Sequence, residues 1–417
     1  MTRKDLKAAY RIMAGDHFPP GMEIAFVDGD HRQTLFFEKA TWTIDNEERG
    51  LRYGENPGQE AALYRLVNGN LQLGEVTCIQ AGRHLASDVE LLQSGKHPGK
   101  TNITDVDNAL NILRYLMDAP CAAIMKHNNP CGVARADSLL EAYDRANMAD
   151  RLAAFGGAIA LNREVDIATA EAIAANYAEV VVAPGFAEGV MSVFETKKSL
   201  RVLQIDNMQQ LQDYAGLRFV DFKSLIDGGV ITQWSYVPET RSAEQLMLAE
   251  TAHKGDSFKI NRPPTPQELD DMIFGWLVEA GVTSNSVLYI KDGATVGIGT
   301  GEQDRVGVAE IARDKAYRKL ADRICWERHG IPYNTIEDDA QREAIDGEVQ
   351  ERRGGLPGSA MISDAFFPFR DGVDVGIQEG VSAIVQPGGS MRDYESIEAC
   401  NASDVTMMFT GQRSFRH

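Results

Sequence analysis

Short apolar runs rich in β-branched residues alternate with amphipathic stretches along this 417-residue chain. The runs end at or near Gly, Pro or Asn, and they lie at 122–132, 179–186, 286–293, 294–301 and 382–390. Apolar residues recur at helical spacing in the stretches at 103–118, 138–155, 163–178 and 264–281. Strands that alternate with helices favour an α/β fold with layered sheets, and we predict that class for this chain.

The length of the chain favours two domains. Two stretches, 237–265 and 330–358, are markedly polar, and we expect a connection at the first and an exposed excursion at the second. We predict a first domain over residues 1–215, with an N-terminal extension, and a second over residues 216–417, with polar excursions.

The charge balance narrows the class of partner. The chain has 61 Asp and Glu residues against 42 Lys and Arg, a net charge of −19, whereas a protein that binds duplex nucleic acid normally presents a basic face. No apolar run reaches the roughly 18 to 20 residues of a membrane helix. The N-terminus lacks the apolar core of a secretory signal, and the five cysteines include no CxxC pair. We therefore expect a cytoplasmic protein with free thiols and neither a nucleic-acid nor a membrane partner.

Two motifs carry candidate polar chemistry. In LRYGENPGQ (51–59), Arg52 offers a two-pronged donor for phosphate and Tyr53 a hydroxyl; the alternative is an ordinary turn. In MKHNNPCG (125–132), Lys126 and His127 stand at the mouth of a strand, before an expected proline turn. That is a natural place for proton-transfer groups, although solvated surface charges are the simpler interpretation.

A zinc site at His127 and Cys131 is disfavoured. The zinc deaminases need H-x-E followed by P-C-x-x-C, but Asn129 stands two residues after His127 and Ala134 three residues after Cys131.

Three further segments leave alternatives open. GIGTGEQDR (297–305) is glycine-rich but misses the dinucleotide-binding fingerprint; it is compatible with a helix N-terminus that favours an anion. SDAFFPFRDG (363–372) fits either a buried aromatic turn or an apolar wall for a flat ring. The C-terminal TGQRSFRH (410–417) is rich in arginine and aromatic residues, which favours a docked segment over a frayed tail.

Taken in order, the segments RYGENPGQ, KHNNPCG, AFGGAIALNREVD, VVVAPGF, SNSV, GIGTGEQDR, DKA, SDAFFPFRDGVD, QPGGS and FRH form a specific set. From about residue 50 to residue 417 the chain resembles the aminoimidazole carboxamide ribonucleotide (AICAR) transformylase part of the bifunctional purine biosynthesis family. The resemblance implies two cytidine-deaminase-like layered α/β units without zinc. It also implies a homodimer whose active sites lie at the interface.

The implied activity is transfer of the formyl group of 10-formyltetrahydrofolate to the 5-amino group of AICAR. Folate is therefore the implied co-substrate, and potassium is bound near the site in many members. By motif match, Lys126, His127 and Asn285 take the catalytic positions. The resemblance implies nucleotide contacts at Arg52, Tyr53, Gly156, Glu179, Gly185 and Arg413. It implies folate-side or aromatic contacts at Arg305, Phe366 and Pro368, and Asp371, Phe415 and His417 complete the substrate-binding set.

The chain also departs from the family pattern. Glu179 stands where many members have Asp, and Gly372 stands where some have Asn. Only about 50 residues precede Arg52, fewer than the roughly 100 or more of a further folded domain. We therefore expect ring closure to fall to a separate IMP cyclohydrolase. The alternatives are a nucleotide-binding regulatory homologue without chemistry and a zinc deaminase.

Overall fold

The computed structural model describes residues 16–44, 46–76 and 78–417, and its alternating helices and strands confirm the predicted α/β class. The described chain divides into two units, each made of two stretches. The first unit holds residues 16–117 and 156–237, and the second holds residues 118–155 and 238–417. These interrupted units do not test the continuous division at residues 215 and 216, which stays a prediction.

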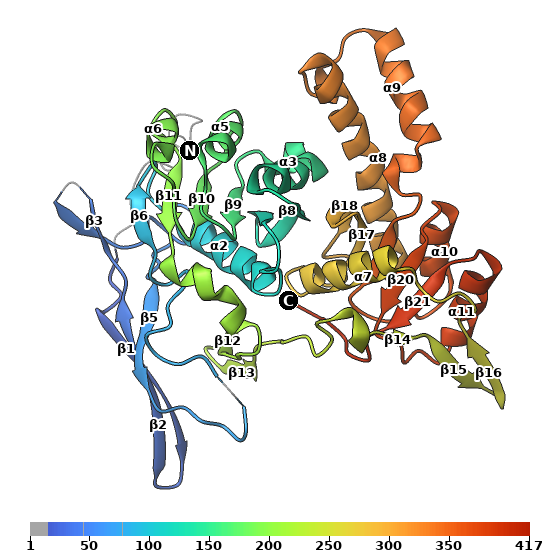
Figure 1. Cartoon of the computed structure of the whole chain (residues 1–417). Coiled ribbons are helices and arrows are strands. Elements are labelled where there is room, and N and C mark those ends of the chain that lie inside the picture. Colours follow the sequence, from blue (N-terminus) through green and yellow to red (C-terminus); the bar gives the residue numbers. More distant parts are fainter. Residues whose placement is uncertain (1–15, 45, 77) are drawn as a thin grey trace. The chain divides into compact units, whose positions relative to one another are not determined.

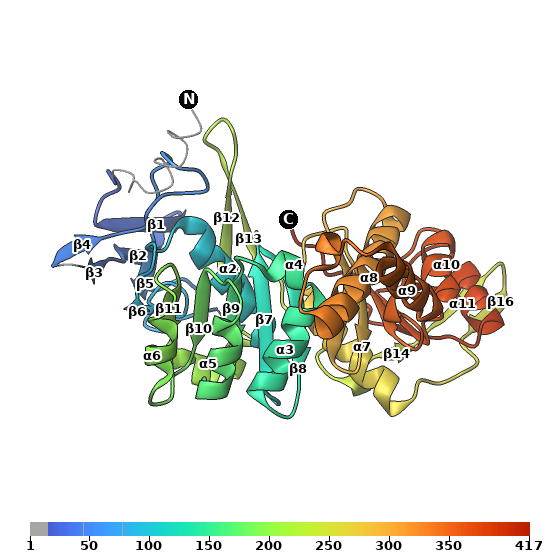
Figure 2. The same cartoon turned by 90° about the horizontal axis from the view of Figure 1, so that it is seen from above.

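The main sheet of the first unit has the strand order β9-β10-β11-β6. Its strands are β6 (Glu90–Gln93), β9 (Ala158–Leu161), β10 (Val180–Ala183) and β11 (Arg201–Gln204). Strands β9, β10 and β11 are parallel, and β6 is antiparallel to β11. Figure 2 shows helices α5 (Ile167–Ala174) and α6 (Val190–Phe194) on one side of these strands and α2 (Lys100–Leu113) on the other. Because the strands are covered on both faces, every residue of β10 is an apolar residue buried from solvent.

Smaller elements complete the first unit (Figure 1). Strands β1 (Gly21–Asp28), β2 (His31–Lys39) and β5 (Tyr64–Gly69) form an antiparallel sheet. Two hairpins pair β3 (Trp42–Ile44) with β4 (Glu47–Arg49) and β12 (Val220–Ser224) with β13 (Val230–Trp234). A 3-10 segment, η1, spans Asp206–Tyr214.

The second unit contains eight strands of the described chain in one sheet, in the order β14-β21-β20-β19-β17-β18-β8-β7. These are β7 (Cys121–Lys126), β8 (Asn129–Arg135), β14 (Met247–Leu248), β17 (Val287–Lys291), β18 (Ala294–Gly299), β19 (Ala360–Ser363), β20 (Ala383–Gln386) and β21 (Thr406–Phe409). Its helices are α3 (Leu139–Ala149), α4 (Arg151–Ala154), α7 (Pro266–Glu279), α8 (Arg305–His329), α9 (Asp339–Glu351), α10 (Asp371–Gln378) and α11 (Asp393–Ala402). A separate hairpin pairs β15 (Glu250–His253) with β16 (Asp256–Lys259). Short 3-10 turns lie at Ala243–Gln245, Tyr333–Thr335 and Arg353–Gly355.

The order of elements repeats along the chain. A helix, a β-hairpin and a helix precede alternating strands and helices in α2-β7-β8-α3-β9-α5-β10-α6-β11. The same order returns in α7-β17-β18-α8-β19-α10-β20-α11-β21, if the one-turn helix α4 and the α9 excursion are set aside. This duplication is not visible in the amino-acid sequence as a fixed period.

Glycines on the second strand of each hairpin bring the next helix close. A Cβ at Gly132 in β8 would stand 2.0 Å from the Ala146 carbonyl oxygen of α3, and one at Gly297 in β18 would stand 2.3 Å from the Ala312 carbonyl oxygen of α8. Both distances are far inside van der Waals contact, so each position requires glycine. Gly297 and Gly299 of the GIGTG segment therefore serve strand-to-helix packing, whereas Gly301 has a left-handed backbone conformation, with a φ of 70°.

Most residues of the polar stretch at 330–358 are exposed, as expected, and part of the stretch is helical. It contains α9, which lies alongside α8 in Figure 1. Ile345 and Val349 of α9 are buried with Leu320 and Ile324 of α8 in a small core of their own. In the described residues, no helix is both long and apolar enough to cross a bilayer.

Candidate active site

His127 lies at the tip of a two-residue hairpin turn. Strands β7 and β8 pair Lys126 with Asn129, and the two residues between them have positive φ, 56° at His127 and 59° at Asn128. Positive φ at both central positions is the pattern of a type I′ turn. The prediction of a strand followed by a proline turn is therefore wrong in detail. Pro130 lies inside β8, where the register shifts opposite Met125, because a bulge tolerates the missing proline N–H.

The other hairpin shows what turn chemistry alone selects. Between β17 and β18 the corresponding residues are Asp292 and Gly293, with φ of 53° and 70°, and Asp-Gly is a preferred pair for this turn. His127 is compatible with the left-handed region but is not among the residues that such a turn favours. Turn chemistry alone therefore does not explain why a histidine, with an exposed side chain, occupies this position.

Lys126 ends strand β7 beside the turn. Its Nζ donates to the carbonyl oxygen of Phe155 at 2.8 Å, and its side chain is half-buried. The amine and the His127 ring thus belong to neighbouring residues at one end of a buried strand.

Asn285 lies in the loop that precedes β17, next to the same turn. The Asn129 Oδ1 accepts from the Thr283 backbone N–H at 2.9 Å and from the Thr300 hydroxyl at 3.0 Å. The three predicted catalytic residues are therefore carried by two segments that bond to each other within the second unit.

Arg305, the first residue of α8, is almost fully buried and faces this loop. One guanidinium nitrogen, Nη2, donates to Asn285 Oδ1 at 2.7 Å. The other, Nη1, donates to the Ser286 carbonyl, the Ser363 hydroxyl and the Asp364 carboxylate. Arg305, which was predicted to contact the folate, thus donates these hydrogen bonds to groups of the protein itself.

Two buried carboxyl groups surround Arg305. Glu279 at the end of α7 and Asp364 after β19 are both fully buried, and Glu279 accepts from the Ser286 hydroxyl. Burial, followed by the Asp364 charge, raises the pKa of Glu279 well above its usual range. The sequence gives no local signal for Glu279, because an acidic residue at a helix end is ordinarily solvated.

The aromatic segment presents alternate faces. Phe367 is fully buried, whereas Phe366, Pro368 and Asp371 are exposed. A Cβ at Gly372 would stand 2.6 Å from the Phe367 ring, so the glycine leaves room for that ring. The segment is therefore a buried aromatic turn at Phe367, and the apolar wall for a flat ring stays a prediction for the exposed Phe366 and Pro368.

The predicted C-terminal residues stack on one another. The Arg413 guanidinium lies 4.3 Å from the centre of the Phe415 ring, and the Phe415 and His417 rings meet edge to face at 5.8 Å. Arg413 and His417 are exposed.

The first unit holds the other predicted residues. Arg52 is buried, and its Nη2 donates to the Tyr53 hydroxyl at 2.6 Å. The Tyr53 carbonyl accepts from Lys100 N at 2.9 Å, which places the pair at the N-terminus of α2. The amide groups at a helix N-terminus favour an anion, so these residues can hold a phosphate.

Glu179 precedes β10 and is held by two side chains that the sequence analysis missed. Arg201 Nη1 and Asn102 Nδ2 each donate to Glu179 Oε2 at 3.3 Å. Arg201 is 1% exposed, and burial lowers its pKa, opposed by Glu179 and reinforced by Arg52. Arg52, Arg201 and Glu179 therefore form one cluster with a net positive charge.

The two predicted glycines of the first unit serve backbone geometry. Gly156 has a φ of 77°, and a Cβ there would approach the Tyr177 ring at 3.3 Å and the Glu179 side chain at 4.0 Å. Gly185 follows β10, and its carbonyl accepts from Val165 N.

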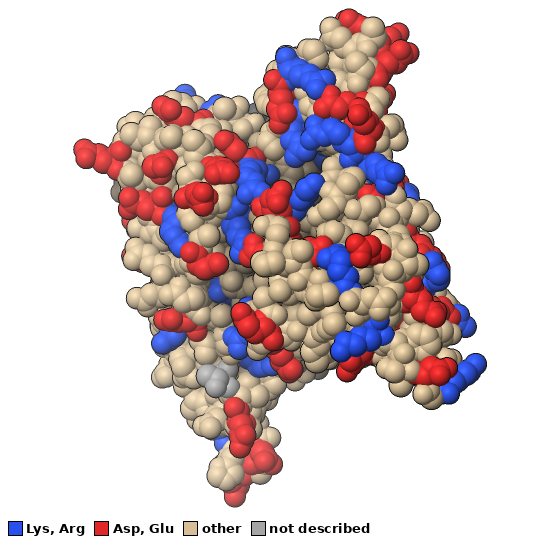
Figure 3. Space-filling model, turned by 45° about the vertical axis from the view of Figure 1, so that its right-hand side comes forward, with Lys and Arg blue, Asp and Glu red and all other residues tan. Residues whose placement is uncertain are grey.

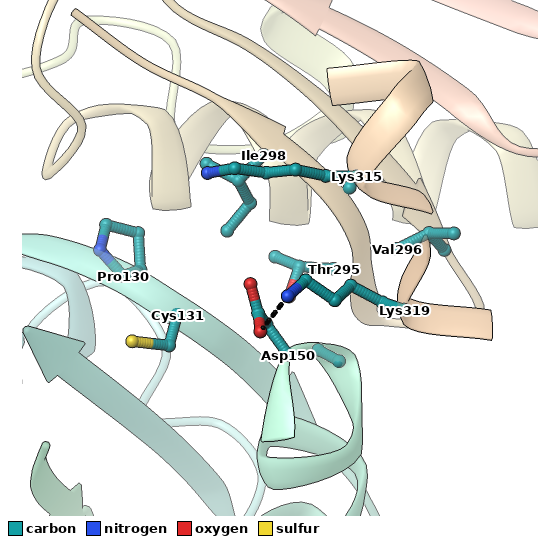
Figure 4. Close-up of a pocket in the computed structure, with 10 residues that line it drawn as sticks. Pro130, Cys131, Asp150, Thr295, Val296, Ile298, Lys315 and Lys319 are labelled. Atoms are coloured by element: carbon teal, nitrogen blue, oxygen red, sulfur yellow. Dashed lines mark ion pairs between the residues drawn. The ribbon is translucent and has the colours of Figure 1, made fainter. Parts of the chain in front are cut away.

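A small hollow in the second unit lies apart from the predicted residues. Figure 4 shows Lys319 paired with Asp150, at 2.8 Å, while the Lys315 side chain extends past Ile298. The hollow encloses about 20 Å³, room for about one water molecule. None of the predicted site residues lines it.

Two further observations concern metal-ligating side chains and the distribution of charge on the surface. Over residues 16–44, 46–76 and 78–417, no group of three or more His, Cys, Asp and Glu side chains is placed to hold a metal ion. On the face shown in Figure 3, acidic side chains are interleaved with basic ones.

The fold and its polar residues define a class: a duplicated α/β protein with a lysine–histidine pair on a hairpin and two buried arginines near a helix N-terminus. Residues 23–315 match the family described as the AICARFT/IMPCHase bienzyme, and this chain belongs to that family.

Curated relatives carry the name "Bifunctional purine biosynthesis protein PurH". The chain is 39% identical to the protein of Ruegeria sp. (strain TM1040) over 369 residues and 39% identical to that of Roseobacter denitrificans over 371 residues. It is 35% identical to the protein of Caldicellulosiruptor saccharolyticus over 367 residues. Each alignment covers 88% of this chain and 59% of the relative, so the chain spans about three fifths of these relatives' length.

Proposed function

We propose that this chain acts in purine biosynthesis as an AICAR formyltransferase. It would transfer the formyl group of 10-formyltetrahydrofolate to the 5-amino group of AICAR, giving formyl-AICAR and tetrahydrofolate. One observation carries the proposal: in a chain of this family, Lys126, His127 and Asn285 lie on two segments joined by the Asn129 side chain.

The chemistry requires a base and a donor. The 5-amino group is conjugated with its ring and is a weak nucleophile. As it attacks the formyl carbon it loses a proton, and negative charge develops on the formyl oxygen. The bond from the formyl carbon to the folate nitrogen then breaks, and that nitrogen takes up a proton as tetrahydrofolate leaves. An exposed imidazole suits the base, because histidine is the side chain that most often transfers protons in enzymes. Lys126 beside it would donate to the developing oxyanion.

Arg305 supports a second donor to the oxyanion. A guanidinium only donates hydrogen bonds, so the Asn285 oxygen must face Arg305, as it does at 2.7 Å. The amide nitrogen then points away from Arg305 and keeps its N–H groups for the substrate. Arg305 would act through Asn285, held in turn by Asp364.

The cluster at the start of α2 would bind the nucleotide. Arg52, Tyr53 and the helix N-terminus offer donors to the phosphate. Glu179, fixed by Arg201 and Asn102, would accept from the donors of the base. Gly156 and Gly185 would let the backbone lie close to the nucleotide, and Arg413 would add a further phosphate contact.

The folate would use the exposed apolar surface of the second unit. Phe366 and Pro368 offer flat faces for a ring, and the Asp371 carboxylate accepts from ring N–H groups. Phe415 and His417 would close the substrate set through the C-terminal stack.

Two buried carboxylates beside Arg305 suit potassium. Glu279 Oε2 and Asp364 Oδ2 are buried oxygen atoms without a hydrogen-bond partner, and oxygen ligands suit such a cation. We propose that these carboxylates would hold potassium, which would offset their charge behind the Asn285 loop. A potassium-dependent rise in melting temperature, reduced in Glu279→Gln, tests this without an activity readout.

The remaining parts of the proposal rest on the resemblance. These are a homodimer with shared active sites and a cytoplasmic location. Size measurement in solution tests the dimer. No observation favours the regulatory homologue, since all three proposed catalytic side chains are present.

The direct test is spectrophotometric. Purified protein mixed with AICAR and 10-formyltetrahydrofolate should release tetrahydrofolate at a rate proportional to enzyme concentration. No release above the rate without AICAR, from folded protein, would refute the proposed function.

A further inference from the structure

The C-terminal segment alternates between two faces. Arg413, Phe415 and His417 stack on one another, and Arg413 and His417 are exposed, whereas Ser414 is buried and Arg416 is half-buried. Side chains of an extended chain alternate in this way. Neither the resemblance nor the proposed function gives a role to these inward residues.

Arg416 bonds to the loop that carries Asn285. Its backbone N–H donates to the Ser284 hydroxyl at 3.0 Å, and its carbonyl accepts from Ser284 N at 2.9 Å. The Ser414 N–H donates to the Asp364 carbonyl at 2.9 Å. The terminal residues are therefore attached directly beside Asn285 and Asp364.

The Arg416 guanidinium reaches the catalytic turn as well. Its Nη1 donates to the Gly281 carbonyl at 2.8 Å and to the Asn128 carbonyl at 3.3 Å. Asn128 is the second residue of the two-residue turn whose first residue is His127. One side chain thus ties the backbone of the His127 turn to the segment that leads into the Asn285 loop.

This link complements the one made by Asn129. The Asn129 side chain bonds to Thr283 and Thr300, while Arg416 bonds to Gly281, Ser284 and the turn itself. A lysine would not reproduce the link, because both bonds come from Nη1 and the ammonium of a lysine ends one bond short of that position.

We infer that Arg416 is a positioning residue that fixes the His127 turn against the Asn285 loop. The expected effect on catalysis rests on the proposed function, whereas the positioning of the turn rests on the hydrogen bonds of Arg416 alone. Arg416 touches carbonyl groups of the protein, so its loss should lower kcat and leave the KM for AICAR nearly unchanged.

The test compares Arg416→Lys and Arg416→Ala with wild type and with Arg352→Lys, a control at an exposed arginine paired with Glu348. Both Arg416 variants should lose at least about tenfold in kcat, because small misplacements of reacting groups are costly, with KM for AICAR within about twofold. Methylguanidinium should restore part of the activity of Arg416→Ala. The control should match wild type. If Arg416→Ala fails to fold, Arg416→Lys decides by the same criteria.

An NMR measurement separates the inference from the proposed function. The His127 ring resonances should shift or broaden in Arg416→Lys and not in Arg352→Lys, whether or not the wild type transfers formyl groups. Unchanged His127 resonances, or a kcat within about twofold of an active wild type, would overturn the positioning role. An inactive wild type with the expected shifts would refute only the proposed reaction.

Discussion

Arg305 Nη2 donates to Asn285 Oδ1 across 2.7 Å, and this bond decides which end of the Asn285 amide is free. Arg305 is fixed at its other nitrogen by Ser286, Ser363 and Asp364. The amide therefore presents its N–H groups away from Arg305 without having to reorient when charge develops, which is the condition for effective oxyanion stabilisation.

Asn285→Asp tests this arrangement. The carboxylate keeps an acceptor for Arg305 but has no N–H to offer an oxyanion. We expect kcat to fall by about 10²- to 10³-fold, as for loss of one oxyanion donor, with little change in KM for AICAR. Steady-state kinetics with a thermal-melting control measure it. A variant with wild-type kcat would show that the Asn285 amide is no donor in the reaction.

His127→Asn tests the base without breaking the turn. Asn accepts the left-handed conformation that the turn needs, so the hairpin should keep its shape. Loss of general-base catalysis should cost about 10²- to 10⁴-fold in kcat and leave AICAR affinity unchanged. Asp292→Asn, at the matching turn of the other hairpin, serves as the control. A kcat within about threefold of wild type would mean that another group takes the proton.

Arg52→Gln tests the nucleotide cluster. Loss of one charge-assisted bond to phosphate should weaken AICAR binding by about 1.5 to 3 kcal/mol, while folate binding stays the same. Arg413→Ala should behave alike. Titration calorimetry with each ligand measures both effects. Equal AICAR affinity in wild type and Arg52→Gln would remove Arg52 from the phosphate site.

Glu268 gives the second unit a pH-dependent stability. Burial opposes its charge. Hydrogen bonds from the Arg262 guanidinium and from the Thr265 backbone N–H outweigh burial and lower the pKa of Glu268 from 4.5 to about 2. A carboxyl whose pKa is lower in the folded state stabilises the fold above its unfolded pKa, and that contribution is lost as the pH falls toward 2. The shift corresponds to roughly 3 kcal/mol at neutral pH.

Glu268→Gln should therefore lower the free energy of unfolding by about 3 kcal/mol at pH 7 and by clearly less near pH 3. Urea unfolding at the two pH values measures this. Glu343→Gln, at an exposed position of α9, is the control and should have little effect. An equal loss at both pH values would show that packing, rather than charge, explains the Glu268 contribution.

Sequence periodicity predicted the α/β class because buried parallel strands such as β10 are continuous apolar runs. It failed at the His127 turn. Asn128, Asn129 and Pro130 are all common turn residues, so the sequence alone predicts the turn too late in the chain, at Pro130. Only the pairing of Lys126 with Asn129 shows that the chain reverses earlier, at a bulge that accommodates Pro130.

Arg201 and Glu279 were not predicted from the sequence for the same reason. Arg201 meets Glu179 through the parallel pairing of β10 with β11, and Glu279 meets Asp364 through packing of elements distant in sequence. No local spacing encodes such contacts. For Arg416 a local signal existed: alternation along 413–417 predicts that residues 414 and 416 face opposite to the stacked aromatic residues.

Transfer of an isotopically labelled formyl group tests the central claim most directly. 10-Formyltetrahydrofolate with a ¹³C-labelled formyl carbon is mixed with AICAR and protein, and the nucleotide product is measured by mass spectrometry over time. The account predicts formyl-AICAR that carries the label, formed by wild type and nearly absent with His127→Asn. Unlabelled AICAR as the only nucleotide recovered from folded wild-type protein, or equal labelling by both proteins, would contradict it.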